Sequence, residues 1–199
     1  MLVVYIVAVI FTLSVCVFAA PLGRYLSVVD LPDGERKLHL HPTPLMGGVA
    51  FVPPVLVTCA FLAFATTLSR FYFVLIFVIF SLTLLGFMDD RRHVPAVLRL
   101  IASASIVLAS IMLVPGIAVI FLSFSFDAQV SAGGPYFLGF VFGIIFTVFC
   151  LVGLQNAVNM ADGHNGLVTG MSLVWSILLM SYAPSHLLPL LLVFAFCIS

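Results

Sequence analysis

The chain has 199 residues, of which 64% are hydrophobic and only 7% are charged. Soluble domains carry about 25% charged residues, so this composition excludes a soluble globular enzyme and a disordered chain. Seven basic residues balance seven acidic ones, which leaves no electrostatic surface for nucleic acid and excludes it as a partner. The composition predicts an integral membrane protein.

Long apolar segments follow one another along the chain. A segment of about 18 or more apolar residues predicts a membrane-spanning helix, because a helix rises about 1.5 Å per residue across a hydrocarbon core about 30 Å thick. The segments cover residues 2–20, 48–66, 71–87, 96–114, 137–158, 167–182 and 187–199. They predict an all-α, polytopic membrane helix bundle of about seven spans, organised as a single transmembrane domain over residues 1–199.

Three details of this pattern carry further expectations. Pro53 and Pro54 in the second segment predict a bend or a delayed start of that helix. Residues 115–136 form a longer connection, whose β-branched and aromatic part predicts a short hairpin or an interfacial segment. The last segment stops at Ser199 without a polar tail, so we expect the chain to be truncated from a longer protein.

Charged residues concentrate on one side of the predicted membrane. Alternating the connections across the bilayer places residues 21–47, 88–95 and 159–166 on the same side. These connections hold five of the seven basic residues, and a sixth, Arg99, lies one turn inside the fourth segment on this side; Arg70 is the exception. The positive-inside rule makes this side cytoplasmic and puts the N-terminus outside. Six of the seven acidic residues share this side, although acids contribute little to topology. This favours a site for a metal ion and phosphates over simple solvated loops.

The first polar segment, residues 30–48, carries the basic pair Arg36 and Lys37. These side chains stand where anionic headgroups or a substrate phosphate would lie, and they serve equally well as a positive-inside anchor. His39 and His41 are two residues apart with no companion cysteine, which argues against a zinc site.

The second polar segment places Asp89 and Asp90 at the end of the third apolar segment, followed by Arg91 and Arg92. Carboxylates at the end of a membrane helix are costly and need compensation. Adjacent helical residues do not face the same way, so we expect one carboxylate to face Mg²⁺ or its water shell and the other to face substrate. A salt-bridge cluster at the helix end is the simpler alternative.

The third polar segment holds Asn156, Asn159, Asp162, Gly163, Asn165 and Gly166. The two amides and the carboxylate recur every three residues, so they line one face of the fifth helix as it leaves the membrane. The glycines then turn the chain. Asn165 is a suitable N-cap for the next helix, whose free N–H groups and positive dipole end suit a diphosphate.

Taken in order, these segments resemble the polyprenyl-phosphate N-acetylhexosamine-1-phosphate transferase family (glycosyltransferase family 4), which are integral membrane enzymes. The resemblance spans residues 21–170 and is carried by Asp30-Leu-Pro, Arg36-Lys37-Leu-His39, Pro42-Thr-Pro44, Gly47-Gly48, Asp89-Asp90 and Asn156-Ala-Val-Asn159-Met-Ala-Asp162-Gly163-His-Asn165-Gly166. Two departures matter. The first segment lacks the Lys-x-Gly-Thr-Pro-Thr run of the muramoyl-pentapeptide branch, and Asn165 stands where the family usually has a second aspartate.

The resemblance implies a bacterial inner-membrane enzyme that faces the cytoplasm and belongs to a fold of about ten spans. Its reaction would transfer N-acetylhexosamine-1-phosphate, preferably GlcNAc-1-phosphate, from a UDP-sugar to undecaprenyl phosphate. The products would be UMP and the undecaprenyl-diphospho-sugar that starts an envelope polysaccharide such as lipopolysaccharide. The implied cofactor is Mg²⁺ or Mn²⁺, and the implied partners are membrane lipid and a second copy of the chain in a homodimer.

The resemblance also assigns roles to single residues. Asp89 or Asp90 would deprotonate or orient the lipid phosphate, with the other closer to the metal ion; direct attack and an aspartyl intermediate both remain open. Asp162 would be a metal ligand together with Asp89. The substrate-binding residues would be Arg36, Lys37, His39, Asn156, Asn159, Gly163 and Asn165.

Other classes of membrane protein fit the sequence less well. A secondary transporter keeps ionisable groups near the midplane on broken helices, whereas these spans are almost free of charge. Metal-dependent phosphatidyl- or prenyl-transferases carry multi-aspartate helices that Asp89-Asp90 does not match. A non-catalytic, truncated membrane protein is the remaining alternative.

Overall fold

The structure is a computed structural model that describes residues 2–30, 42–92, 94–122, 136–161 and 167–198. The chain divides into two compact units. Unit 1 comprises Met1–Val94 and Val158–Ser199, and unit 2 comprises Pro95–Ala157. Each unit is described by itself below.

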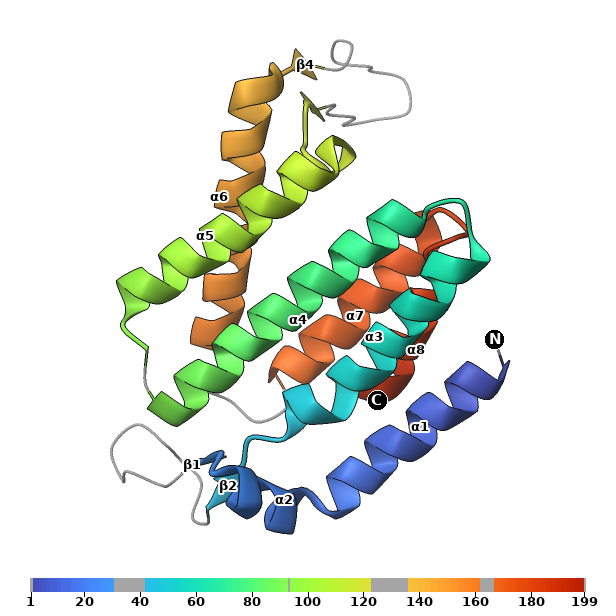
Figure 1. Cartoon of the computed structure of the whole chain (residues 1–199), viewed down its shortest axis with the longest axis vertical. Coiled ribbons are helices and arrows are strands. Elements are labelled where there is room, and N and C mark those ends of the chain that lie inside the picture. Colours follow the sequence, from blue (N-terminus) through green and yellow to red (C-terminus); the bar gives the residue numbers. More distant parts are fainter. Residues whose placement is uncertain (1, 31–41, 93, 123–135, 162–166, 199) are drawn as a thin grey trace. The chain divides into compact units, whose positions relative to one another are not determined.

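Unit 1 contains most of the helices and one short antiparallel ribbon (Figure 1). Its elements are α1 (Leu2–Val17), α2 (Ala19–Leu26), β1 (Val29–Asp30), β2 (Thr43–Pro44), α3 (Gly47–Ala65), α4 (Ser69–Arg92), α7 (Leu167–Tyr182) and α8 (Leu188–Ile198). Unit 2 holds α5 (Ala96–Leu113), the 3₁₀ turn η1 (Pro115–Ile117), β3 (Phe121–Leu122), β4 (Tyr136–Phe137) and most of α6 (Phe140–Ala161).

All seven predicted apolar segments form helices, which confirms the all-α class. Within the described residues, α3, α4, α5 and α6 are long and apolar enough to cross a membrane, and the bent pair of α1 and α2 adds a fifth candidate. Helices α7 and α8 have only 16 and 11 residues. A polytopic membrane protein therefore fits the structure, and the count of about seven spans stays a prediction.

One local expectation is wrong, and one of the two alternatives for the proline pair is excluded. Residues 21–26 were expected in a polar connection but belong to helix α2. The proline pair does not delay the second apolar helix, because α3 begins at Gly47 and carries both prolines inside it. The hairpin expected between the fourth and fifth segments is confirmed: β3 and β4 pair antiparallel, with Phe121 opposite Phe137.

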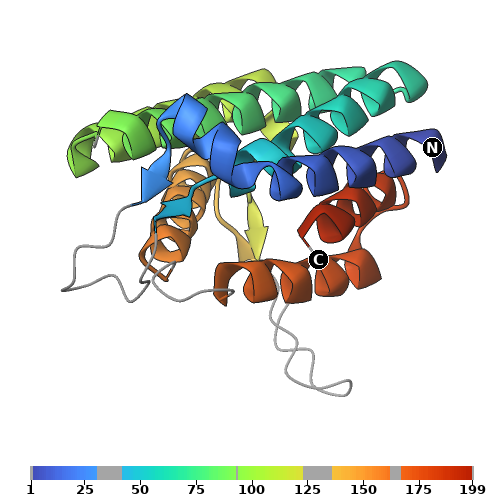
Figure 2. The ribbon, with the colours of Figure 1, turned by 90° about the horizontal axis from the view of Figure 1, so that it is seen from below.

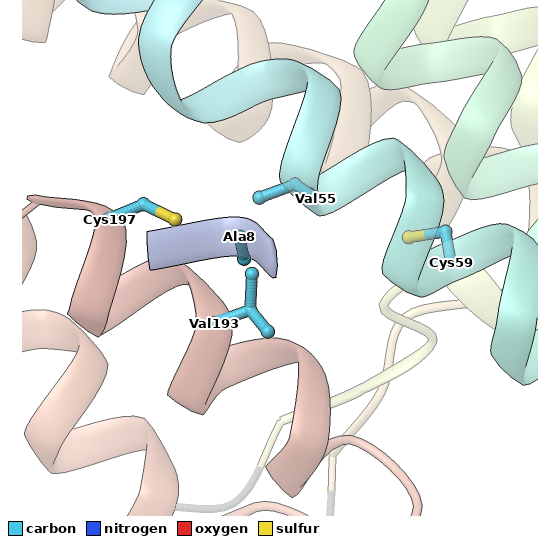
Figure 3. Close-up of a cluster of buried hydrophobic side chains, with 5 residues drawn as sticks. All are labelled: Ala8, Val55, Cys59, Val193 and Cys197. Carbon is cyan, nitrogen blue, oxygen red and sulfur yellow. The ribbon is translucent and has the colours of Figure 1, made fainter. Parts of the chain in front are cut away.

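Helix α3 is the centre of unit 1, where it contacts α1, α4 and α8. Figure 2 shows α7 and α8 on one side of the layer formed by α1, α3 and α4. One cluster of buried side chains joins three of these helices (Figure 3): Ala8 of α1, Val55 and Cys59 of α3, and Val193 and Cys197 of α8. Small residues at such contacts let helix backbones approach closely in a membrane, where packing drives association.

A hydrogen bond between helices compensates for the proline pair in α3. Pro53 and Pro54 have no N–H, so the carbonyls of Val49 and Ala50 lose the donors that would lie four residues later. The Thr12 hydroxyl of α1 donates to the Ala50 carbonyl at 3.1 Å in a buried position. A carbonyl without a hydrogen-bond partner in hydrocarbon costs about 2–7 kcal/mol. Thr12 thus supplies the donor that Pro54 lacks.

Unit 2 is held by a small core between α5 and α6. Val107, Ile111 and Ala118 are buried there, and one face of α6 packs against them. The chain before β3 lies on α6, where the Thr147 hydroxyl accepts a hydrogen bond from the Val119 N–H at 2.8 Å. Gly143 permits this approach, because a Cβ at that position would lie 2.8 Å from the Val119 carbonyl oxygen.

We expect Thr12→Val to lower the free energy of unfolding by about 1–2 kcal/mol, because the buried Ala50 carbonyl loses the donor that Thr12 provides. Thermal unfolding of the purified protein in detergent measures the change. The Pro54→Ala variant regains a backbone N–H, so Thr12→Val should cost less in that background.

Thr83→Val is the matched control, since the Thr83 hydroxyl bonds only within its own helix, to the Ile79 carbonyl at 2.7 Å. An equal loss for Thr12→Val with and without Pro54→Ala would contradict the compensation.

Candidate functional site

One end of unit 1 gathers the elements that flank the first two polar segments. Val15, Val28, Met46 and Ala50 form a buried cluster there, and Phe87 in the last turns of α4 packs against it. The cluster lies beside the β1–β2 ribbon, whose strands lead into and out of residues 31–41. The two flanks of the first polar segment and the C-terminal end of α4 therefore lie at the same end of unit 1. The basic residues of that segment, Arg36, Lys37 and His39, lie outside the described residues.

Helix α2 supports the ribbon at a close backbone contact. A Cβ at Gly23 would lie 2.7 Å from the Cβ of Pro44 in β2, so the glycine is required for the contact. The chain leaves α2 through Ser27, which has a left-handed backbone with φ 58°. Val28 then donates to the Gly23 carbonyl at 3.0 Å and accepts from the Leu45 N–H at 2.9 Å. These bonds determine where the first polar segment begins and ends.

The acidic pair closes α4. Asp89 is half-buried, and its Oδ1 accepts a hydrogen bond from the Val94 N–H at 2.9 Å, so this carboxylate turns toward the chain that leaves the helix. Asp90 is exposed. Helix C-termini carry partial negative charge, which disfavours carboxylates and favours cations. Arg91 and Arg92 in the last turn offset this, and the Arg91 guanidinium lies 5.6 Å from the Phe87 ring centroid.

The amides of the third segment lie on the last turns of α6. Asn156 is half-buried and Asn159 is exposed, and their spacing puts them on one helical face as predicted. The boundary between the units falls between them, so Asn156 belongs to unit 2 and Asn159 to unit 1. Asp162, Gly163 and Asn165 lie outside the described residues. Their predicted roles stay predictions.

One hydrogen bond indicates the direction in which α7 runs within unit 1. The Tyr72 hydroxyl, near the start of α4, donates to the His186 carbonyl at 2.7 Å in the turn between α7 and α8. Helix α7 therefore ends near the start of α4, and the two helices run in opposite directions within unit 1 (Figure 1). Residues 162–166 directly precede Leu167.

A magnesium site needs few protein ligands. Mg²⁺ is usually held by one or two carboxylates, with water and substrate phosphates completing its shell. The carboxylate of Asp89, or of Asp89 with Asp90, fits that donor set. In the part of the chain that the structure describes, no three His, Cys, Asp or Glu side chains are grouped as a metal site, and Asp162 is outside that part.

Two features of this end escaped the sequence prediction. The sequence could have predicted helix α2, because its less exposed residues recur with the spacing of one helical face. These residues are Ala19, Leu22, Gly23 and Leu26. The bond from Val94 to Asp89 has no comparable signal, since it depends on how the chain turns after the helix.

Comparison with known proteins gives consistent matches. The family model described as glycosyl transferase family 4 matches residues 72–199. The chain is similar to proteins named phospho-N-acetylmuramoyl-pentapeptide-transferase. One from Desulfosudis oleivorans is 33% identical over 156 residues, which cover 75% of this chain and 42% of that protein. One from Streptococcus pneumoniae is 36% identical over 128 residues, covering 64% and 39%. The chain thus matches less than half the length of these relatives.

We expect Gly23→Ala to lower the free energy of unfolding by about 1–3 kcal/mol, because the new methyl group overlaps Pro44 and the ribbon must move. Gly170→Ala in α7 is the control, since a Cβ there meets no described atom within 4 Å. Thermal unfolding in detergent compares the two. If both variants unfold at the temperature of the unmodified protein, the contact of α2 with β2 does not stabilise the fold.

Proposed function

Since the chain belongs to glycosyl transferase family 4, we propose that the protein transfers a hexosamine-1-phosphate from a UDP-sugar to undecaprenyl phosphate. The observation that carries this proposal is the position of the acidic pair. Asp89 and Asp90 close a membrane-length apolar helix, at the same end of unit 1 as both flanks of the basic first segment. Acidic and basic groups would therefore meet at one membrane surface.

The reaction joins two anions. An oxygen of the lipid phosphate forms a bond to the phosphorus that carries the sugar, and the bond from that phosphorus to the oxygen of UMP breaks, so UMP leaves with the electron pair. Such chemistry depends mainly on positioning the reactants and on neutralising their charges. Arg36, Lys37 and Arg91 would bind the phosphates. Mg²⁺, when bound, would withdraw charge from the diphosphate.

The carboxylates of Asp89 and Asp90 would have different roles in the reaction. Asp90 is exposed and would accept the proton of the lipid phosphate or orient it. Asp89, whose direction is set by the Val94 N–H, would contribute to the metal site together with Asp162. The remaining proposed substrate contacts come from His39, Asn156, Asn159, Gly163 and Asn165.

We propose UDP-GlcNAc as the donor, because the first segment lacks the Lys-x-Gly-Thr-Pro-Thr run of the muramoyl-pentapeptide branch. UDP-MurNAc-pentapeptide is the second candidate donor, since the relatives described above carry the name phospho-N-acetylmuramoyl-pentapeptide-transferase. The site would face the cytoplasm of a bacterial inner membrane with the N-terminus outside, as the distribution of basic residues favours. Residues 1–199 would then be the N-terminal part of one transmembrane domain.

We expect Asp90→Asn in the full-length protein to reduce sugar-phosphate transfer at least about 100-fold while membrane insertion persists, because the amide cannot accept the proton. Membranes are incubated with radiolabelled UDP-GlcNAc, undecaprenyl phosphate and Mg²⁺, and labelled lipid is counted. Arg70→Gln is the matched control, since it also changes one charge but lies at the other end of α4.

Labelled lipid that added UMP removes would support the transferase. Labelling only with UDP-MurNAc-pentapeptide would reassign the donor, and uptake into vesicles without lipid labelling would replace the proposal with a transporter. Normal turnover in Asp90→Asn would remove that carboxylate from the mechanism.

A further inference from the structure

Helix α2 has a packed face and an exposed face. Ala19, Leu22 and Leu26 pack against the buried cluster at this end of unit 1, and Gly23 faces β2. The other face presents Arg24 and Tyr25, and Tyr25 is 86% exposed. This short helix therefore has a fixed orientation, with its basic and aromatic side chains turned away from the protein.

The bend between α1 and α2 sets the direction of that face. The two helix axes differ by 75° across the break at Phe18. Pro21 explains the bend, because it has no N–H to donate to Val17 and its ring crowds that carbonyl. Membrane helices tilt by only about 20° on average, so an α1 that spans the bilayer leaves α2 lying close to the membrane plane.

The length of α1 sets the depth at which α2 lies in the bilayer. Its 16 residues rise about 24 Å, most of the hydrocarbon thickness of about 30 Å. Helix α2 follows directly, where the acyl chains give way to headgroups. Tyrosine concentrates at this depth because its ring is apolar and its hydroxyl is polar. Arginine extends its charge to the phosphates there. The Arg24 Nε donates to the Ala20 carbonyl at 3.3 Å, which holds the guanidinium along the exposed face.

We propose that the exposed face of α2 docks in the headgroup layer of the bilayer, with Tyr25 at the interface and Arg24 paired with the phosphate of an anionic phospholipid. Charge complementarity selects this partner, since Arg24 is the only charged residue of α2. The contact does not depend on the proposed reaction. Helix α2 supports β1 and β2 through the contact of Gly23 with Pro44. Contact of α2 with the lipid would therefore also hold in place the two strands that flank the first polar segment.

A fluorescent probe at position 25 tests the depth. The probe is attached to Tyr25→Cys in the full-length protein after Cys16→Ser and Cys150→Ser remove the exposed cysteines, and the protein is reconstituted into phosphatidylcholine vesicles. We expect stronger quenching by a headgroup nitroxide on phosphatidylcholine than by a nitroxide deep in the acyl chain. Val174→Cys in the middle of α7 is the control, with the opposite order expected. Quenching by aqueous iodide alone, or mainly by the deep nitroxide, at position 25 would overturn the proposal.

The same probe tests the lipid charge. A fixed amount of headgroup-labelled phosphatidylcholine is kept while the unlabelled lipid is changed to phosphatidylglycerol. One basic side chain enriches anionic lipid about five-fold, the equivalent of about 1 kcal/mol, so quenching should fall when Arg24 is present. Arg24→Gln should abolish the fall and Arg24→Lys should retain it, while the Val174 probe confirms that each variant is folded and inserted. If quenching does not change when phosphatidylglycerol replaces the unlabelled lipid in the protein that retains Arg24, the proposed pairing with an anionic lipid phosphate is wrong.

Discussion

The hydrogen bond from Thr12 to the Ala50 carbonyl is the contact on which the end of unit 1 that holds the candidate site depends. It holds α1 against α3 where Pro54 leaves the helix without a donor. Ala50 is also part of the buried cluster that receives α2, the chain beside the ribbon and Phe87 of α4. The bond that compensates for Pro54 thus also anchors the cluster at which both flanks of the first polar segment and the last turns of α4 meet.

The same constraint explains the other polar groups inside the helices. A hydroxyl within hydrocarbon needs a partner, and Thr58, Ser110 and Ser176 each donate to the carbonyl four residues earlier in their own helix. Large apolar side chains such as Phe64 and Phe149 are mostly exposed, as expected where acyl chains are the solvent. Charges therefore collect at helix ends, and in α4 they lie at both ends.

The sequence predicts the helices well because apolar segments alternate with polar connections; the bounds of α7 agree at both ends. It fails where a local contact overrides composition. Arg24 and Tyr25 made residues 21–26 look like a polar loop, but α2 forms because its other face packs on unit 1. The delayed start of α3 that the prolines suggested does not occur, and Thr12, far away in the chain, supplies the donor that Pro54 lacks. For the site, charge counts predict the side of the membrane, whereas the partner of Asp89 depends on tertiary geometry. The predicted roles of Arg36, Asp162 and Asn165 stay predictions, because these residues lie outside the part of the chain that the structure describes.

The asymmetry of the acidic pair has a physical origin in the end of α4. Neighbouring residues on a helix point in different directions, so Asp89 and Asp90 cannot present their oxygens to one ion in the same way. The Val94 N–H donates a hydrogen bond to the Asp89 Oδ1, which orients that carboxylate before any ligand arrives. Orientation by a second group is what a metal ligand requires. Asp90, the next residue, is more exposed to solvent than Asp89. The proposed division of roles rests on this difference in orientation and exposure between Asp89 and Asp90.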